Sequence, residues 1–213
     1  WIKRGITDTR QNILSAGNDG NDESQLRFDA TGYLRFKEST GNSPEFLLDT
    51  NALFRDPAAW YHIVVAVDTT QSTDSDRIKI YVNGSQETSL SSSSYPNQNA
   101  SMPFGLASYN QRIGERDSGD YFDGILSHFH YIDGTAYTPS AFGETDTTTG
   151  EWKAKTSPSV TYGNNGFLIL KDGNTITDQS SNSNDFTLSA GTLTDLKDNP
   201  DNVFATLNPL NRN

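Results

Sequence analysis

The most informative absence in this chain of 213 residues is cysteine, of which the sequence contains none. Disulfides and thiolate metal sites are therefore excluded, which suits folding in a reducing cytoplasm and is compatible with an extracellular destination. No apolar run approaches the roughly 18 residues of a membrane-spanning helix, so we expect no membrane insertion. Positive charge is also scarce, because 16 Lys and Arg residues stand against 27 Asp and Glu, a formal net charge of −11. Such a chain repels phosphate backbones, and no basic stripe offsets the charge, so nucleic acid is not an expected partner.

Short apolar runs separated by polar turn residues make up most of the chain. Only 33% of the residues are hydrophobic, but 11% are aromatic, so a few large rings must fill much of the core. Gly, Ser, Asn, Asp and Thr crowd between the apolar runs, which is typical of an all-β chain. A chain of this length can hold one β-sandwich, or one sandwich with a small appendage.

The clearest pattern lies between Trp60 and Gly84. Residues 63–67 form a β-branched apolar run, as a buried strand would. Residues 78–82 alternate between apolar and polar side chains, which predicts a strand with one buried face. Asn83 and Gly84 supply the positive φ angles of a tight hairpin turn, and residues 86–90 can return as a third strand. The pattern predicts an antiparallel meander.

Weaker patterns extend the prediction along the chain. Leu26-Arg27-Phe28 and Leu34-Arg35-Phe36 alternate around a polar turn, which indicates a hairpin. Ser91–Ser94 cannot bury anything, so we expect an exposed loop there. Thr138-Pro139, with Thr138 as the N-cap, predicts one short helical turn. Further strands are expected at 1–4, 13–16, 46–48, 104–107, 122–132 and 166–170, with a weaker one at 185–188.

Three stretches carry a family resemblance. They are the meander just described, Tyr121-Phe122-Asp123-Gly124-Ile125-Leu126-Ser127, and Tyr131-Ile132-Asp133-Gly134 followed by Thr138-Pro139-Ser140-Ala141-Phe142-Gly143. Together they resemble laminin-G-like domains with the concanavalin A-like jelly roll. The whole set of motifs is similar to the form of this domain that is common in tail-fibre and other virion proteins of bacteriophages, particularly marine ones. Two further motifs belong to this set, Gly150-Glu151-Trp152-Lys153 and Ala205-Thr206-Leu207-Asn208-Pro209-Leu210. The resemblance implies an all-β, antiparallel β-sandwich with at most one short helix.

The resemblance also implies a domain organisation and a setting. Residues 1–162 would form the sandwich without its N-terminal strand, which leaves the strand at 1–4 open. Residues 163–213 would either supply closing strands or link to a following unit, and would end in an extended tail. Because open strand edges are commonly covered by another chain, we expect a homo-oligomer, a trimer, in contact with other virion subunits. The expected location is the phage particle, assembled in the host cytoplasm.

A polar and aromatic loop after residue 108 is the candidate recognition site. Sugar recognition stacks an aromatic ring on the pyranose and hydrogen-bonds its hydroxyls with a few aimed polar groups. The residues of these types are Tyr109, Asn110, Arg112, Arg116, Asp117, Asp120 and Tyr121. The alternative is a hairpin loop whose tyrosines cover the sandwich edge.

An acidic loop is the candidate metal site. Asp19, Asn21, Asp22 and Glu23 concentrate oxygen donors, and calcium takes six to eight oxygens from such places. The alternative is a solvated turn, since the spacing of a twelve-residue calcium loop is missing.

The sequence also contains partial patterns of a zinc site and of a glucan-cleaving active site. His128 and His130 are two apart on an expected strand and could join His62 at a zinc ion, but a role on the sheet surface is the simpler expectation. Glucan-cleaving jelly rolls carry Glu-x-Asp-x-x-Glu on one strand, whereas Glu144-Thr145-Asp146 lacks the last acid. We therefore expect no enzymatic activity.

Three functions follow in order of preference. The first is a structural module of a phage tail fibre, appendage or decoration protein, which could also mediate attachment to the host surface. The second is an adhesin domain that recognises host surface glycan. The third is a glycan-degrading depolymerase, which needs a carboxyl pair at roughly 5–9 Å.

Overall fold

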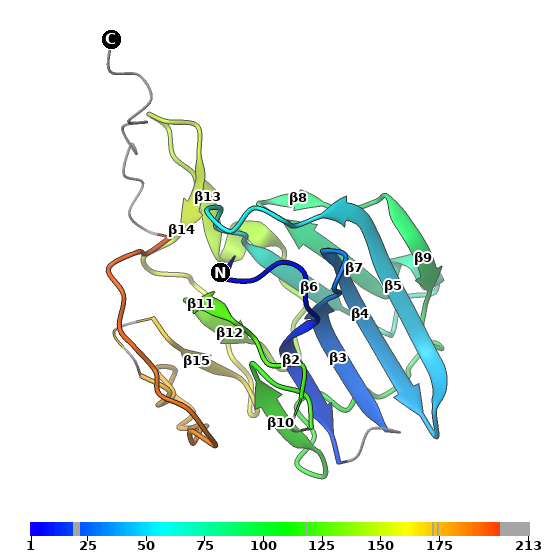
Figure 1. Cartoon of the computed structure of the whole chain (residues 1–213). Coiled ribbons are helices and arrows are strands. Elements are labelled where there is room, and N and C mark those ends of the chain that lie inside the picture. Colours follow the sequence, from blue (N-terminus) through cyan, green and yellow to red (C-terminus); the bar gives the residue numbers. More distant parts are fainter. Residues whose placement is uncertain (19–21, 118, 172, 174, 201–213) are drawn as a thin grey trace.

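The computed structural model describes residues 1–18, 22–117, 119–171, 173 and 175–200, and within them the chain is all-β. Two layers of antiparallel strands face each other, as Figure 1 shows. This is the β-sandwich jelly roll that the sequence predicts, and the fold class is confirmed. In place of a single short helix there are two three-residue 3-10 turns, at Asp74–Asp76 and Pro139–Ala141.

The first layer is a six-stranded sheet in the order β10-β2-β3-β4-β5-β9. Its strands are β2 (Gln11–Gly17), β3 (Glu23–Phe28), β4 (Tyr33–Thr40), β5 (Ser43–Leu53), β9 (Leu90–Ser94) and β10 (Asn110–Ile113). The expected hairpin is the β3–β4 pair, in which Leu26 lies opposite Phe36. The turn between them closes through Gly32, whose N–H donates to the carbonyl of Asp29 over 2.8 Å.

The second layer is assembled from shorter pieces. Strands β6 (Ile63–Val67), β7 (Ile78–Val82) and β8 (Ser85–Gln86) form a three-stranded sheet. β1 (Ile2–Arg4) pairs with β11 (Gly124–Leu126), and β12 (Phe129–Tyr131) pairs with β15 (Phe167–Ile169). A further pair, β13 (Gly143–Thr145) with β14 (Trp152–Ala154), closes one end.

β1 joins these pieces, because it has neighbours on both sides. Ile2 and Tyr61 exchange two backbone hydrogen bonds of 2.9 and 2.8 Å, while the other edge of β1 pairs with β11. The expectation of an open edge at residues 1–4 is therefore wrong, and it no longer supports assembly. β15 likewise extends the layer with residues that follow position 162.

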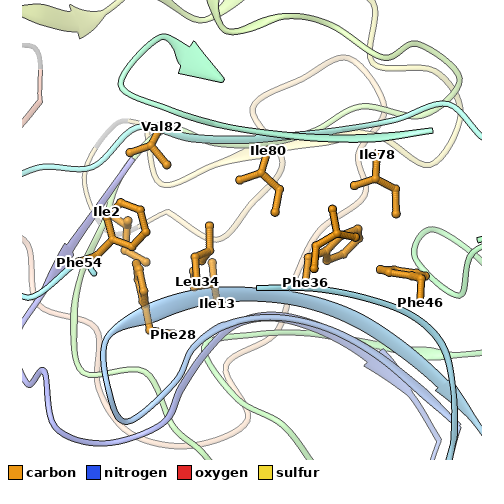
Figure 2. Packing of buried hydrophobic residues seen from close by; sticks show 11 residues of the cluster. Ile2, Ile13, Phe28, Leu34, Phe36, Phe46, Phe54, Ile78, Ile80 and Val82 are labelled. Atoms are coloured by element: carbon orange, nitrogen blue, oxygen red, sulfur yellow. The ribbon is translucent and has the colours of Figure 1, made fainter. Parts of the chain in front are cut away.

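The core lies between the two layers (Figure 2). Ile78, Ile80 and Val82 point from β7 toward Leu34 and Phe36 on β4, as their alternation predicts. Each large apolar side chain buried this way stabilises the fold by about 1.5–3 kcal/mol. The turn that returns β7 to β8 is at Asn83 and Gly84, whose φ angles are 49° and 83°.

Four expectations about strands are corrected. Residues 104–107 and residues 185–188 lie in turns and irregular segments rather than in strands. Residues 91–94 are not a loop but belong to the edge strand β9, since pairing with β5 needs only the backbone and leaves the serines in solvent. The long strand expected at 122–132 is broken into β11 and β12 by His128, whose φ is 48°. That left-handed residue also ends the alternation that would place His128 and His130 on one face.

Candidate binding site beside strand β10

A cavity of about 1230 Å³ lies beside β10, at the side of the sandwich. Its walls come from four parts of the chain: the loop before β10 and β10 itself, the segment around β11, residues of β12 and β15, and residues 184–199. Figure 1 shows β15 and the orange-to-red residues that follow it on the side of the molecule where β10 lies. A volume of this size is ample for an oligosaccharide, because small-molecule sites typically occupy 300–1,000 Å³.

Four of the seven predicted recognition residues line this cavity: Tyr109, Asn110, Arg112 and Tyr121. Tyr121 is 58% exposed, and Asn110 is also exposed, so both can reach a ligand. Tyr109 is half-buried. The structure therefore brings an exposed aromatic ring, an amide and a guanidinium to one hollow, and these are side-chain types that sugar recognition uses.

The loop that carries Tyr109 is held in shape by Gln111. The Nε2 of Gln111 donates to the carbonyl of Pro103 at 3.0 Å and to that of Tyr109 at 3.2 Å. Its Oε1 accepts the N–H of Gly105 at 3.3 Å. Gln111 carries no signal in the sequence, because nothing in the local pattern distinguishes a loop-bridging glutamine from a solvated one.

Arg112 is oriented by its neighbours. Its Nη1 donates to the carbonyl of Gly17 at 3.0 Å, and its Nε lies 3.5 Å from Glu115 Oε1. Asp117 is more distant, at 3.9 Å from Nη2, and is exposed. With its direction set in advance, the guanidinium loses less rotamer entropy when it binds a ligand.

Aromatic residues from later in the chain complete the wall. Phe167 stacks on Tyr131 with 5.5 Å between ring centroids and meets Phe186 edge-on at 4.7 Å. Burial raises the pKa of Tyr131 to about 12, so its hydroxyl stays protonated. These rings lie up to 77 positions from Tyr109 in the chain, counted as the difference between 186 and 109, so local sequence patterns could not place them here.

Residues 184–199 form the outer wall and present three exposed leucines, Leu188, Leu193 and Leu196. This wall is fastened by Asp198, whose Oδ2 accepts from Lys3 Nζ at 2.6 Å and whose Oδ1 accepts from Trp60 Nε1 at 3.0 Å. Both hydrogen bonds lower the pKa of the Asp198 carboxyl. The fastening joins the C-terminal segment to β1 and to the start of the central meander.

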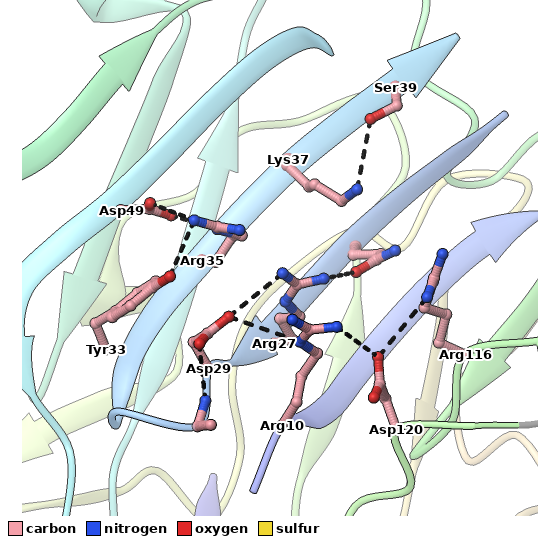
Figure 3. A network of polar contacts seen from close by, with 12 residues as sticks. Arg10, Arg27, Asp29, Tyr33, Arg35, Lys37, Ser39, Asp49, Arg116 and Asp120 are labelled. Carbon is pink, nitrogen blue, oxygen red and sulfur yellow. Dashed lines mark hydrogen bonds and ion pairs between the residues drawn. The ribbon is translucent and has the colours of Figure 1, made fainter. Parts of the chain in front are cut away.

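Of the three remaining predicted residues, Asp117 lies near Arg112 without lining the cavity. Arg116 and Asp120 lie on a different surface. This surface is the face of the six-stranded sheet that points away from the core, and we name it the outer face. Cross-strand register places Ser15, Gln25 and Lys37 in one row on it, with Arg27, Arg35 and Asp49 in the next. Figure 3 shows the charged residues of this face.

Ion pairs link the charged groups of the outer face. Asp49 receives two hydrogen bonds of 2.7 Å from Arg35, a bidentate pair. Glu23, which is buried, contacts Arg116 at 2.7 Å and Lys37 at 3.1 Å. These groups hold the loop after β10 against β3.

Of the four predicted calcium ligands, the structure describes two, Asp22 and Glu23. Asp19 and Asn21 lie outside the described residues. Asp22 Oδ1 accepts the N–H of Gly41 at 2.6 Å, and Glu23 is engaged by the two cations of the outer face. In the part of the chain that the structure describes, no three His, Cys, Asp or Glu side chains are grouped to hold a metal ion. Calcium binding by the full set stays a prediction.

The histidines have structural partners. His62 Nδ1 accepts from Trp152 Nε1 at 2.9 Å, and His130 Nδ1 lies 2.9 Å from the hydroxyl of Tyr162. His128 Nδ1 lies 2.8 Å from the hydroxyl of Ser127. Burial lowers the pKa of His62 and of His130 to about 3, so both are neutral at physiological pH.

The acidic string at residues 144–146 spans the end of β13 and the start of the turn to β14. Asp146 Oδ1 accepts the N–H groups of Thr148 and Thr149 at 2.8 and 3.0 Å, and its Oδ2 pairs with Lys153 at 2.8 Å. The hydrogen bond from Lys153 is the largest single cause that lowers the pKa of Asp146, followed by the backbone N–H groups of Thr149 and Thr148. Its interactions therefore serve the β13–β14 connection.

Comparison with known proteins identifies the class. The family model described as the concanavalin A-like lectin/glucanases superfamily matches residues 1–139. Because the match covers more than half of the chain, this protein belongs to that superfamily, whose members include sugar-binding and sugar-cleaving domains. Searches of curated proteins and of solved structures returned no significant match. Among the described residues, no helix has the length and apolar character that a membrane crossing requires.

Proposed function

We propose that this chain is a non-enzymatic module of a phage virion, in a tail fibre or another appendage, that attaches to carbohydrate on the host surface through the cavity beside β10. The observation that carries the proposal is the exposed ring of Tyr121, 58% accessible, in a cavity that Asn110 and Arg112 also line. An exposed ring beside hydrogen-bonding groups is the arrangement that stacks on a sugar. The lectin and glucanase character of the superfamily supports carbohydrate as the ligand.

The virion setting is supported by the resemblance of the sequence motifs to phage tail-fibre proteins. A homo-oligomer, a trimer, is part of the proposal, and so is contact with other virion subunits. The absence of catalysis belongs to it as well. The acids of the outer face support this last point, because Glu23 and Asp49 are each paired with arginine.

The test is binding of the full chain to a glycan array and to host cells, with and without a calcium chelator. Tyr121→Ala should weaken binding roughly three- to tenfold, since an aromatic contact contributes about 0.5–1.5 kcal/mol. Tyr121→Phe keeps the ring and should bind like the parent. Leu53→Ala, which removes another exposed apolar side chain, is the matched control. Equal binding by parent and Tyr121→Ala would remove the cavity from the function, and loss on chelation would assign a role to the loop at 19–23.

A purely structural role is the second candidate. Leu188, Leu193 and Leu196 are 49%, 39% and 52% exposed on one short segment, and a neighbouring subunit could cover them. Light scattering of the isolated chain decides this point. A monomer at micromolar concentration would count against the subunit contact, whereas a trimer that Leu188→Ser/Leu196→Ser dissociates would support it.

A further inference from the structure

Strand β9 forms one border of the six-stranded sheet, on the side away from the cavity (Figure 1). It pairs with β5, and among the described residues no strand pairs with its other edge. The N–H and C=O groups along a free edge are ready to pair with another strand, so proteins commonly protect such edges with charged side chains or proline. The five residues of β9, Leu90-Ser91-Ser92-Ser93-Ser94, include neither.

β9 also lies in the longest stretch of the sequence without a charged residue. From Thr88 to Gln111, 24 successive residues contain no Asp, Glu, Lys or Arg, whereas 20% of the whole chain is charged. Ser91, Ser93 and Ser94 are exposed, and their short side chains leave room for another backbone to approach. The edge is therefore open in both charge and shape.

The missing charge matters because two copies of this chain repel each other. Each copy has a formal net charge of −11, so contact is least opposed where the surface is neutral. Two acids beside β9 are paired within the chain: Asp49, opposite Ser92, lies 2.7 Å from Arg35, and Asp76 lies 3.0 Å from Lys79. Glu87 is a third acid on this side. The border at β9 thus suits a second copy better than the charged parts of the surface do.

A small pocket adjoins the same edge. It has a volume of about 210 Å³, and its apolar wall consists of Leu48, Ile78, Ile80 and Leu90, from strands of both layers. A strand added beside β9 would project alternate side chains toward this pocket. Leu90 is the apolar side chain that β9 itself possesses, so in a pairing of two copies the second Leu90 can enter the pocket and bury apolar area.

We propose that β9 pairs in antiparallel orientation with β9 of a second copy, so that the six-stranded sheets of two chains continue into each other. A two-fold axis brings the same surface of both chains together, as in most homodimers. The backbone groups supply the hydrogen bonds, and serines that face each other across the axis can add their own. This contact is separate from the three leucines and from the cavity, and in a trimeric assembly it joins two trimers.

The test is the molar mass of the full chain, measured by light scattering from micromolar to submillimolar concentration. The parent should double its mass as the concentration rises. Ser91→Lys/Ser93→Lys places like charges along the strand that meet across the two-fold axis, and should keep the mass at half that of the parent. Ser157→Lys/Ser159→Lys is the matched control, because it adds the same charges at the same spacing on exposed residues outside the strands. Circular dichroism checks that both variants are folded.

Hydrogen exchange of the parent tests the contact without any substitution. The backbone amides of β9 should exchange more slowly at high than at low concentration, while those of the two-residue strand β8 should not change. Equal exchange of β9 at both concentrations would overturn the contact. Equal masses for the parent and Ser91→Lys/Ser93→Lys would do so as well, and an equal effect of the control would show that net charge, not strand pairing, governs assembly.

The variants of the proposed function separate this contact from the others. Leu188→Ser/Leu196→Ser should remove a threefold step in mass and keep the twofold one. Tyr121→Ala should weaken glycan binding and leave the mass unchanged. A twofold step that disappears in Leu188→Ser/Leu196→Ser would assign it to the leucines and overturn the role of β9.

Discussion

The Nε1–H of Trp152 donates to Nδ1 of His62 over 2.9 Å, and this bond sets the tautomer of the histidine. Because Nδ1 accepts, the neutral ring carries its proton on Nε2. The bond also attaches β14, which lies beyond the part of the chain that matches the superfamily, to the central meander. His62 is further enclosed by Trp1, whose ring stacks on it with 4.5 Å between centroids.

Replacing Trp152 with phenylalanine should destabilise the fold. Trp152→Phe removes the N–H donor and leaves buried His62 Nδ1 without it, so the free energy of unfolding should fall by about 1–3 kcal/mol. Urea denaturation monitored by circular dichroism measures this change. Trp60→Phe is the control, because Trp60 donates to the partly exposed Asp198 and should contribute less. A loss from Trp152→Phe no greater than that from Trp60→Phe would contradict the role of the bond.

Adding a methyl group at Gly143 should displace the same indole. A Cβ at Gly143 would lie 2.6 Å from Trp152 Cε2, so Gly143→Ala forces the ring to move and weakens its bond to His62. We expect a loss of about 1–3 kcal/mol, the range for overpacking. Gly119→Ala is the matched control, since the nearest atom to its Cβ is 3.7 Å away. Thermal melts of the two variants should differ clearly, and equal melting temperatures would argue against a tight contact at Trp152.

Acid should destabilise the protein through its neutral histidines. Burial lowers the pKa of His62 and His130 to about 3 in the folded chain, against 6.5 for a free histidine. The unfolded chain therefore binds more protons between these values, and stability that is complete above pH 6.5 is lost as the pH falls toward 3. Each histidine contributes up to about 1.4 kcal/mol per pH unit. Urea midpoints from pH 7 to 4 measure the slope, which His130→Gln should reduce; an unchanged slope would contradict this assignment.

Glu38 should have the opposite dependence on pH. Burial raises its pKa to about 7, despite the hydrogen bond of 3.1 Å that it accepts from Ser24. The folded chain then holds a proton that the unfolded chain releases above pH 4.5, so stability falls as the pH rises from 4.5 to about 7. Glu38→Gln should raise the free energy of unfolding by roughly 1–3 kcal/mol at pH 8 and change it little at pH 4. Equal effects at both pH values would show that the carboxyl is not responsible.

Breaking the fastening at Asp198 should loosen the cavity wall alone. Asp198→Ala removes the acceptor of Lys3 and Trp60, so hydrogen exchange in residues 184–197 should rise. Global stability should change by less than about 1 kcal/mol, because the Asp198 side chain is 44% exposed. Asp195→Ala is a control within the same segment. Unchanged exchange in Asp198→Ala would mean that packing, not this carboxylate, holds the wall.

Local patterns by themselves determined one hairpin in each of the two layers. The alternation at 78–82 and the Asn83-Gly84 turn specify β7 and its return, because side-chain direction in a strand and positive φ in a turn are properties of neighbouring residues. The same holds for the β3–β4 hairpin. Local reasoning failed at Ser91–Ser94, where the partner strand rather than the serines makes the strand, and at His128, where one left-handed residue divides the expected strand in two.

The candidate sites required the tertiary structure. The loop residues Tyr109, Asn110, Arg112 and Tyr121 could be chosen from their chemistry, but their cavity exists only because residues 184–199 lie against them. The buried polar atoms of the outer face are harder still to predict, since Asn12, Gln25 and Asp120 belong to separate segments and look ordinary in the sequence. Whether a buried polar atom has a partner depends on groups that folding brings together across long separations, so only the folded chain reveals it.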